Sequence, residues 1–163
     1  MLNVQVCQEQ FRDISKRYDS NYALIIEEIN PIIFWIKNVD LPGLSIDTQE
    51  VPYEGIKLQN AGNNLNFDHV ITPIFFVDEK LQVPNYFFNW IMGWKMGSSY
   101  EGKKQKHGAV VLFDNNSINV MGLYHFSNMY AESMSKINLR NKASVPLELT
   151  VTIKFDQWWP EIT

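Results

Sequence analysis

Residues 147–156 read LELTVTIKFD and alternate between apolar and polar side chains without a break. Strict alternation over this length is typical of a β-strand with one buried face and one wet face. An isolated strand cannot bury one of its faces. The segment therefore predicts a sheet that is covered on one side.

Shorter segments that also favour strands make up most of the chain from residue 21 onward. Residues 22–26 and 32–36 are β-branched and aromatic, and they read as a hairpin around the turn signal Asn30-Pro31. Further strands are predicted at residues 45–51, 66–72, 74–77, 109–113, 118–126 and 133–139. We expect the strand at 66–72 to continue past Pro73 through a bulge.

Residues 52–65 contain several breakers. Pro52, Gly55 and the cluster Asn60-Ala61-Gly62-Asn63-Asn64 interrupt the chain, whereas residues 56–59 alternate. This combination predicts a protruding hairpin or an extended arm.

In residues 84–96, PNYFFNWIMGWKM, the spacing of apolar residues changes from the period of a strand to that of a helix. Phe87, Trp90, Ile91 and Trp94 fall at i, i+3, i+4 and i+7, which places them on one face of a helix. Many short strands and one helix predict a mainly β domain, either a sandwich or a small barrel with one packed α-helix at about residues 84–96.

Composition limits the function classes. The chain has 163 residues, 45% hydrophobic and 20% charged, so it is expected to fold as one domain over residues 1–163. Residues 1–20 are polar, and they read as an N-terminal arm or a short helix. The net charge of −4 argues against a dedicated nucleic-acid binder. No signal peptide and no membrane anchor are expected, because the apolar runs are short.

Residues that could carry out catalysis are few. His69, His107 and His125 do not pair at i, i+4, and Cys7 is the single cysteine. No phosphate-binding loop or nucleophile elbow occurs. We therefore expect no enzyme, with no catalytic residue, cofactor or metal site.

Two adjacent tryptophans, Trp158 and Trp159, follow the alternating strand. They cannot both enter one pocket of a small domain. In one interpretation, Trp158 or Trp159 packs against a neighbouring subunit, since large aromatic side chains anchor interfaces. In the other reading, both pack within one subunit.

The order of the elements is distinctive over roughly residues 9–159. The segments that carry it are Leu41-Pro42-Gly43, Ala61-Gly62-Asn63-Asn64, Leu65-Asn66-Phe67-Asp68, Phe88-Asn89-Trp90, Gly122-Leu123-Tyr124 and Phe155-Asp156-Gln157-Trp158-Trp159. In this order, the chain resembles the tail tube proteins of contractile-tailed bacteriophages.

The resemblance implies two packed antiparallel sheets with a helix at the side. It implies a structural virion protein whose hexameric rings stack into the inner tail tube, with one sheet of each subunit joining a barrel around a channel. The implied partners are the chain itself, the sheath, and baseplate or tail-terminator proteins, with DNA passing through the lumen during genome ejection. Its place would be the virion tail, after assembly in the host cytoplasm.

Two alternatives stay open. One is a baseplate protein with the same fold that initiates the tube. The other, from a different class, is a monomeric ligand-binding β-barrel whose aromatic side chains line a pocket.

Candidate surfaces follow from these expectations. The wet face of the alternating strand is the candidate channel lining, and it comprises Glu148, Thr150, Thr152, Lys154 and Asp156. The candidate subunit or ring interface comprises Val51, Pro52, Tyr53, Ile56, Leu58, Trp158 and Trp159.

Overall fold

The computed structural model describes residues 22–27, 36–96, 105–113, 119–139 and 145–162. The predicted N-terminal arm or short helix at residues 1–20 and most of the predicted strand at 32–36 lie outside these residues. No helix within the described ranges is long and apolar enough to cross a membrane.

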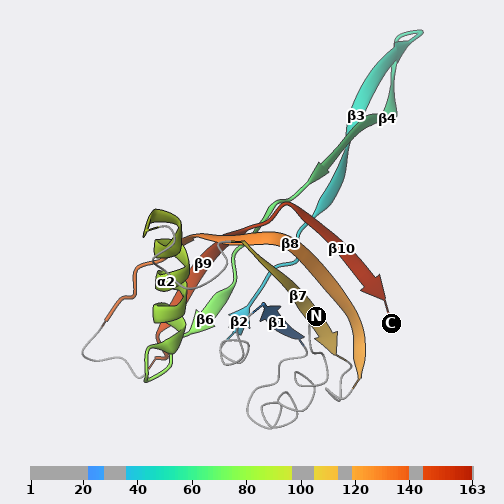
Figure 1. Ribbon diagram of the computed structural model, residues 1–163. Coiled ribbons are helices and arrows are strands. Elements are labelled where there is room, and N and C mark those ends of the chain that lie inside the picture. The colour runs from blue at the N-terminus through green and yellow to red at the C-terminus, as the bar shows by residue number, and fades with distance from the viewer. Residues whose placement is uncertain (1–21, 28–35, 97–104, 114–118, 140–144, 163) are drawn as a thin grey trace.

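Four antiparallel strands form the first sheet. They are β1 (Tyr22–Ile26), β7 (Lys106–Phe113), β8 (Val120–Met134) and β10 (Gln157–Ile162), in the spatial order β1-β7-β8-β10. In this sheet, β8 uses its N-terminal part, which lies between β7 and β10 (Figure 1).

The C-terminal part of β8 belongs to the second sheet. There it pairs with β9 (Glu148–Lys154), whose other edge is covered by β5 (Val70–Ile71) and β6 (Ile74–Phe76); β2 (Ile36–Asn38) completes the sheet beside β6. Pro73 separates β5 from β6, as its missing N–H demands, and its carbonyl oxygen accepts a 3.0 Å hydrogen bond from the Val151 N–H. The predicted continuation past Pro73 is therefore two short strands along one edge of β9.

One core joins the two sheets and the helix. The first sheet contributes Leu24, Ile26 and Val110, and the second contributes Phe75, Leu149, Val151 and Ile153. Helix α2 (Gln82–Met96) adds Val83, Phe87 and Trp90, with the Phe75 and Phe87 ring centroids 5.0 Å apart. The predicted fold class, two packed antiparallel sheets with one packed helix, is confirmed. The described strands do not close into a barrel, because β1 and β2 end the hydrogen-bonded path.

The start of α2 is fixed by a side chain. The buried Asp78 carboxylate accepts a 3.2 Å hydrogen bond from the Val83 N–H, so it satisfies a first-turn donor that has no partner in the helix. The helix begins at Gln82, two residues before the prediction. Trp94, predicted on the buried face, is 41% exposed, but its ring contacts Tyr130 at 5.6 Å.

The predicted protruding hairpin is confirmed. Strands β3 (Leu44–Tyr53) and β4 (Ile56–Phe67) form a separate two-stranded sheet that extends away from the body (Figure 1). We call residues 44–67 the arm. Glu54 and Gly55 connect the strands, both with positive φ (46° and 83°), which is the backbone of a tight two-residue hairpin turn.

The predicted break at residues 60–64 was wrong. Strand β4 runs through it, and the pairing register shifts there, between Ile46 and Thr48 on the opposite strand. Gly62 permits this close approach, because a Cβ at this position would lie 2.6 Å from the Asp47 carbonyl oxygen. The Asn66 side-chain amide also donates a 2.6 Å hydrogen bond to the Asp47 carboxylate.

A second prediction was also wrong. Residues 120–134 form one strand, although the sequence predicted two separate strands at 118–126 and 133–139. Pairing on both edges holds this stretch in the strand: Ser127 lies opposite Gln157 on β10, Met129 opposite Lys106 on β7, and Tyr130 opposite Lys154 on β9. Those partners are distant in sequence, so local breaker signals misplace the strand end.

Candidate assembly surfaces

The first sheet has two edges that carry no described strand. Within the described residues, β1 pairs with β7 alone and β10 with β8 alone. The Glu27 N–H donates to the His107 carbonyl oxygen at 2.8 Å, which sets the phase of the ladder. Because antiparallel hydrogen bonds alternate, the backbone groups of Tyr22, Leu24 and Ile26 point away from β7.

The registers of β7, β8 and β10 continue this alternation across the sheet. The backbone hydrogen-bonding positions of Pro160 and Ile162 on β10 therefore point away from β8. Pro160 therefore stands where no N–H is needed within the chain, which suits an edge strand. No strand in the described part of the chain pairs with these outward backbone groups, and edges of this kind are a template for pairing with another strand.

The two faces of the first sheet differ. Leu24, Val110 and Phe126 point into the core between the sheets. The opposite face, which we call the outer face, carries a second apolar cluster of Ala23, Ile25, Ala109, Val111, Phe113 and Leu123. Toward β10 the outer face becomes polar and aromatic.

That polar end is built around one histidine. His125 Nε2 lies 2.6 Å from Glu161 Oε2, and its ring stacks on Trp159 with centroids 5.3 Å apart. The register places Trp159 directly opposite His125 on the neighbouring strand, which accounts for the stacking. The Trp159 side chain remains 47% exposed, so this cluster borders the free edge.

The structure separates the two predicted tryptophans. Trp158 points to the core side, where its ring stacks on Tyr124 at 5.9 Å and meets Phe67 edge-on at 6.3 Å. Trp159 lies on the outer face. Strand alternation therefore gives each tryptophan a different environment, which the sequence did not resolve.

The arm carries the remaining predicted interface residues. The register places Val51 opposite Leu58 and Tyr53 opposite Ile56, so these four side chains share one face near the tip. We call them the tip patch; their exposed fractions run from 41% to 64%. Pro52 lies opposite Lys57 on the other face, away from the patch.

The predicted channel-lining residues lie on the outward face of the second sheet. Strand β9 alternates as predicted, with Leu149, Val151 and Ile153 buried and the polar positions between them partly exposed. Lys154 contacts Glu132 at 2.6 Å, and the Asn128 amide donates to Asp156 at 2.7 Å. The channel-lining role stays a prediction.

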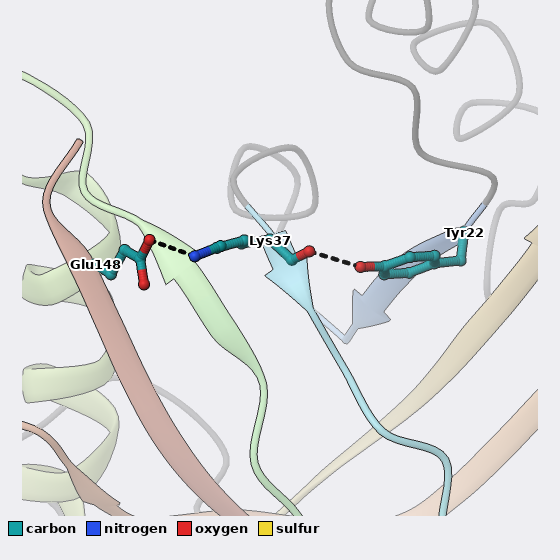
Figure 2. Close-up of polar contacts among 3 residues, drawn as sticks. All are labelled: Tyr22, Lys37 and Glu148. Atoms are coloured by element: carbon teal, nitrogen blue, oxygen red, sulfur yellow. Dashed lines mark hydrogen bonds and ion pairs between the residues drawn. The ribbon is translucent and has the colours of Figure 1, made fainter. Parts of the chain in front are cut away.

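Glu148 takes part in a chain of polar contacts that joins the two sheets (Figure 2). The Lys37 ammonium on β2 donates to the Glu148 carboxylate, and the Lys37 carbonyl accepts a 2.8 Å hydrogen bond from the Tyr22 hydroxyl on β1. Burial, and to a lesser extent the nearby Asp40 carboxylate, raise the pKa of Tyr22. The neutral phenol that this contact needs is therefore favoured.

Within the described residues, no group of His, Cys, Asp and Glu side chains is arranged to hold a metal ion. The surface features that stand out among these residues are sheet edges without a described partner strand, an exposed apolar arm and the half-exposed Trp159.

Comparisons with known proteins gave matches only at the level of structure. No protein-family model matches the sequence, and the search of curated proteins found no relative. A chain of the PVC extracellular contractile injection system, from its sheath–tube complex in the extended state, superimposes with a TM-score of 0.61. It shares 14% identity, and the match covers 100% of this chain and 99% of that one.

Two further structures agree. A chain of the anti-feeding prophage baseplate gives a TM-score of 0.62 at 11% identity, covering 86% of this chain and 90% of that chain. Hcp1 from Flavobacterium johnsoniae gives a TM-score of 0.56 at 14% identity, and the match covers 88% of this chain and 97% of that chain. The protein therefore has the fold of the tube proteins of contractile injection systems, as the sequence resemblance predicted.

Proposed function

We propose that this chain is a structural subunit of a contractile tail tube, in which hexameric rings stack around a channel. The observation that carries the proposal is the first sheet, whose two free edges, β1 and β10, have similar lengths of five and six residues. In this proposal, the whole chain, residues 1–163, forms one ring subunit.

The strand number makes ring closure simple. Among the described residues, the first sheet has an even number of antiparallel strands, so rotation about a ring axis would bring β10 of one copy antiparallel to β1 of the next. A closed ring of this kind leaves no exposed edge. A neighbour in structure comes from a six-fold symmetrised baseplate, which favours six copies.

The outer face of the first sheet would then face the channel, because its other face packs on the core. The polar face of β9 is the alternative lining, and labelling of assembled tubes distinguishes the two. A bulky thiol reagent should fail to reach Gln157→Cys in the first case and Thr152→Cys in the second. Cys7 would first be replaced by serine.

The arm is the proposed contact between rings. Its exposed apolar tip patch has no described partner within the chain, and a two-stranded ribbon is only marginally stable alone. Insertion of the tip patch against a copy in the adjacent ring would bury it. Trp159, at the β10 edge, would contact the neighbouring copy in the same ring.

The remaining partners follow from the assembly. A sheath around the tube and a baseplate or terminator at its ends are consistent with the structures that share this fold. The acidic balance of the chain would allow DNA to pass during genome ejection without tight binding, since the 18 Asp and Glu residues outnumber the 14 Lys and Arg residues that could neutralise phosphates. We place the assembled protein in the virion tail and its assembly in the host cytoplasm.

Electron microscopy of the purified protein tests the proposal. Rings, and tubes at high concentration or on a baseplate template, are expected. A protein that stays monomeric under all these conditions would contradict it.

The baseplate initiator is the second candidate, and the likeness to a baseplate chain favours it. Copy number separates the two roles: hundreds of copies in each particle indicate the tube, and a single ring indicates the initiator. The monomeric ligand-binding barrel loses support, because the described strands do not enclose a barrel.

A further inference from the structure

The arm carries a second apolar patch besides the tip patch. Nearly half of the large apolar side chains that are exposed in the described residues belong to the arm. Those outside the tip patch form two cross-strand pairs close to the body, Leu44 opposite Phe67 and Ile46 opposite Leu65. We call these four residues the root patch; their exposed fractions run from 41% to 55%.

The two patches lie on opposite faces of the ribbon. Side chains alternate along β3, which places Ile46 on one face and Asp47, Val51 and Tyr53 on the other. The 2.6 Å hydrogen bond from the Asn66 amide to the Asp47 carboxylate agrees with this assignment, because both side chains then share the second face. A contact that buries the tip patch on its own face therefore leaves the root patch uncovered.

Pairing within the arm does not cover the root patch. Cross-strand pairs stabilise a ribbon through the sides of the residues that face each other. The remaining surface of each side chain stays in water, as the exposed fractions show. Contiguous exposed apolar patches mark interaction sites on folded proteins. Two patches of similar exposure on opposite faces therefore indicate two separate contacts.

The root patch has a fixed position beside β10. The Gly43 N–H donates a 2.8 Å hydrogen bond to the Asp68 carboxylate, and the Asp68 N–H donates one of 3.1 Å to the Gly43 carbonyl oxygen, so the two ends of the arm are tied together. Phe67 meets Trp158 of β10 edge-on at 6.3 Å, at the point where the arm leaves the body (Figure 1). The patch therefore adjoins the β10 edge, which has no described partner strand.

We propose that the root patch docks on the neighbouring copy of this chain within the same ring, while the tip patch contacts the adjacent ring. The inference rests on the proposed function, in which the neighbouring copy pairs along the β10 edge. A copy at that edge lies next to the root patch, so the two contacts form one continuous interface. Every copy carries the patch, and a closed homo-oligomer supplies one partner surface for each. Ring formation then holds the arm at its root and directs its tip toward the next ring.

Two single substitutions, one residue apart, test the root patch in the full-length protein. Ile46→Lys places a charge in the patch, and Ser45→Lys is the matched control at an exposed position on the opposite face. We expect Ile46→Lys to raise the protein concentration for half-maximal ring formation by about tenfold or more, because every seam loses an apolar contact. Ser45→Lys should leave that concentration unchanged. Analytical ultracentrifugation measures it, and both monomers should melt at the same temperature.

Photo-crosslinking is a second measurement that keeps the patch apolar. Ile46→p-benzoylphenylalanine should give cross-linked dimers on a denaturing gel, several-fold more than Ser45→p-benzoylphenylalanine. The sample is single rings separated from tubes by sedimentation. Because no adjacent ring is present, a dimer reports a contact within the ring. If Ile46→Lys lowers the melting temperature, the dimer yield decides the question.

Each outcome supports or overturns the proposal. Equal ring formation by Ile46→Lys and Ser45→Lys would overturn it. Rings that form normally but no longer stack would assign the root patch to the adjacent ring, and cross-links confined to single chains would assign it to its own copy. Absence of rings from the unaltered protein would contradict the proposed function, and this inference with it. Rings that tolerate Ile46→Lys would contradict the inference alone.

Discussion

At the scale of single residues, the contact between Tyr22 and Lys37 shows how a polar group ties separate sheets together. The Tyr22 hydroxyl on β1 reaches the Lys37 carbonyl on β2, and the Lys37 side chain continues to Glu148 on β9. The Lys37–Glu148 pair is about 40% exposed on each side, so solvent screening leaves it a contribution of roughly 0–1 kcal/mol.

Replacing Tyr22 by phenylalanine isolates this hydrogen bond. We expect Tyr22→Phe to lower the free energy of unfolding by about 0.5–1.5 kcal/mol at neutral pH. Since the folded-state pKa is raised, the stability from the neutral phenol is complete below the ordinary tyrosine pKa of about 10 and is lost as pH rises through the folded-state pKa. The stability gap between the two proteins should therefore narrow above about pH 10.

Urea unfolding of both proteins across this range measures the gap. The other tyrosines titrate in both chains, so their effect cancels in the difference. A gap that stays constant or widens with pH would show that the Tyr22 phenol does not favour its neutral form in the folded protein.

At the scale of elements, helix α2 was predictable because its apolar period was complete. Phe87 and Trp90 lie in the core as the i, i+3 spacing required, and the capping carboxylate of Asp78 precedes the helix by four residues. Adjacent phenylalanines provide an internal control. Phe87 is fully buried, whereas Phe88 is 48% exposed.

We expect Phe87→Ala to lower the free energy of unfolding by about 3–5 kcal/mol, because it leaves a cavity beside Phe75. Phe88→Ala should change it by less than about 1 kcal/mol. Denaturant titration of the two variants checks the contrast, and similar losses from both would mean that the helix packs through a different face.

The sequence predicted the existence of the arm but not the pairing register of its strands. The alternation at residues 56–59 and the turn residues indicated a hairpin, whereas the Asn-rich residues 60–64 indicated that the second strand ends there. The strand continues because Gly62 allows the backbones of β3 and β4 to approach at the register shift, a property of the pair that neither strand shows alone. The sequence likewise did not predict that β1 and β10 form the edges of the first sheet. Strand order in a sheet depends on partners that are far apart in sequence.

The proposed contact between rings can be tested at the tip patch. The double substitution Tyr53→Ser with Ile56→Ser removes two side chains that face each other and are about 60% exposed. We expect an unchanged melting temperature and intact rings, but no tubes by electron microscopy. Glu50→Ala with Lys57→Ala is the matched control. It removes an exposed ion pair near the same tip and should leave tube formation intact.

At the scale of the whole molecule, the proposed ring depends on the two edges of the first sheet that have no described partner strand. Along β10, alternation leaves the N–H groups of Trp158 and Ile162 pointing outward, while Pro160 has none. Few donors are therefore available to a neighbouring β1, and each should matter. Ile162 is the better site for a test, because its side chain is 88% exposed and adds little to the core.

Ile162→Pro removes this outward donor and so weakens every seam of a ring by about 1 kcal/mol. Because a closed ring contains several identical seams, the losses multiply, and we expect the ring fraction in analytical ultracentrifugation to fall sharply while the monomer melts at the same temperature. Ile162→Ala truncates the same side chain but keeps its N–H, so it should form rings like the unaltered protein. If both variants form rings equally well, the seam does not run along β10, and the ring must close through another surface.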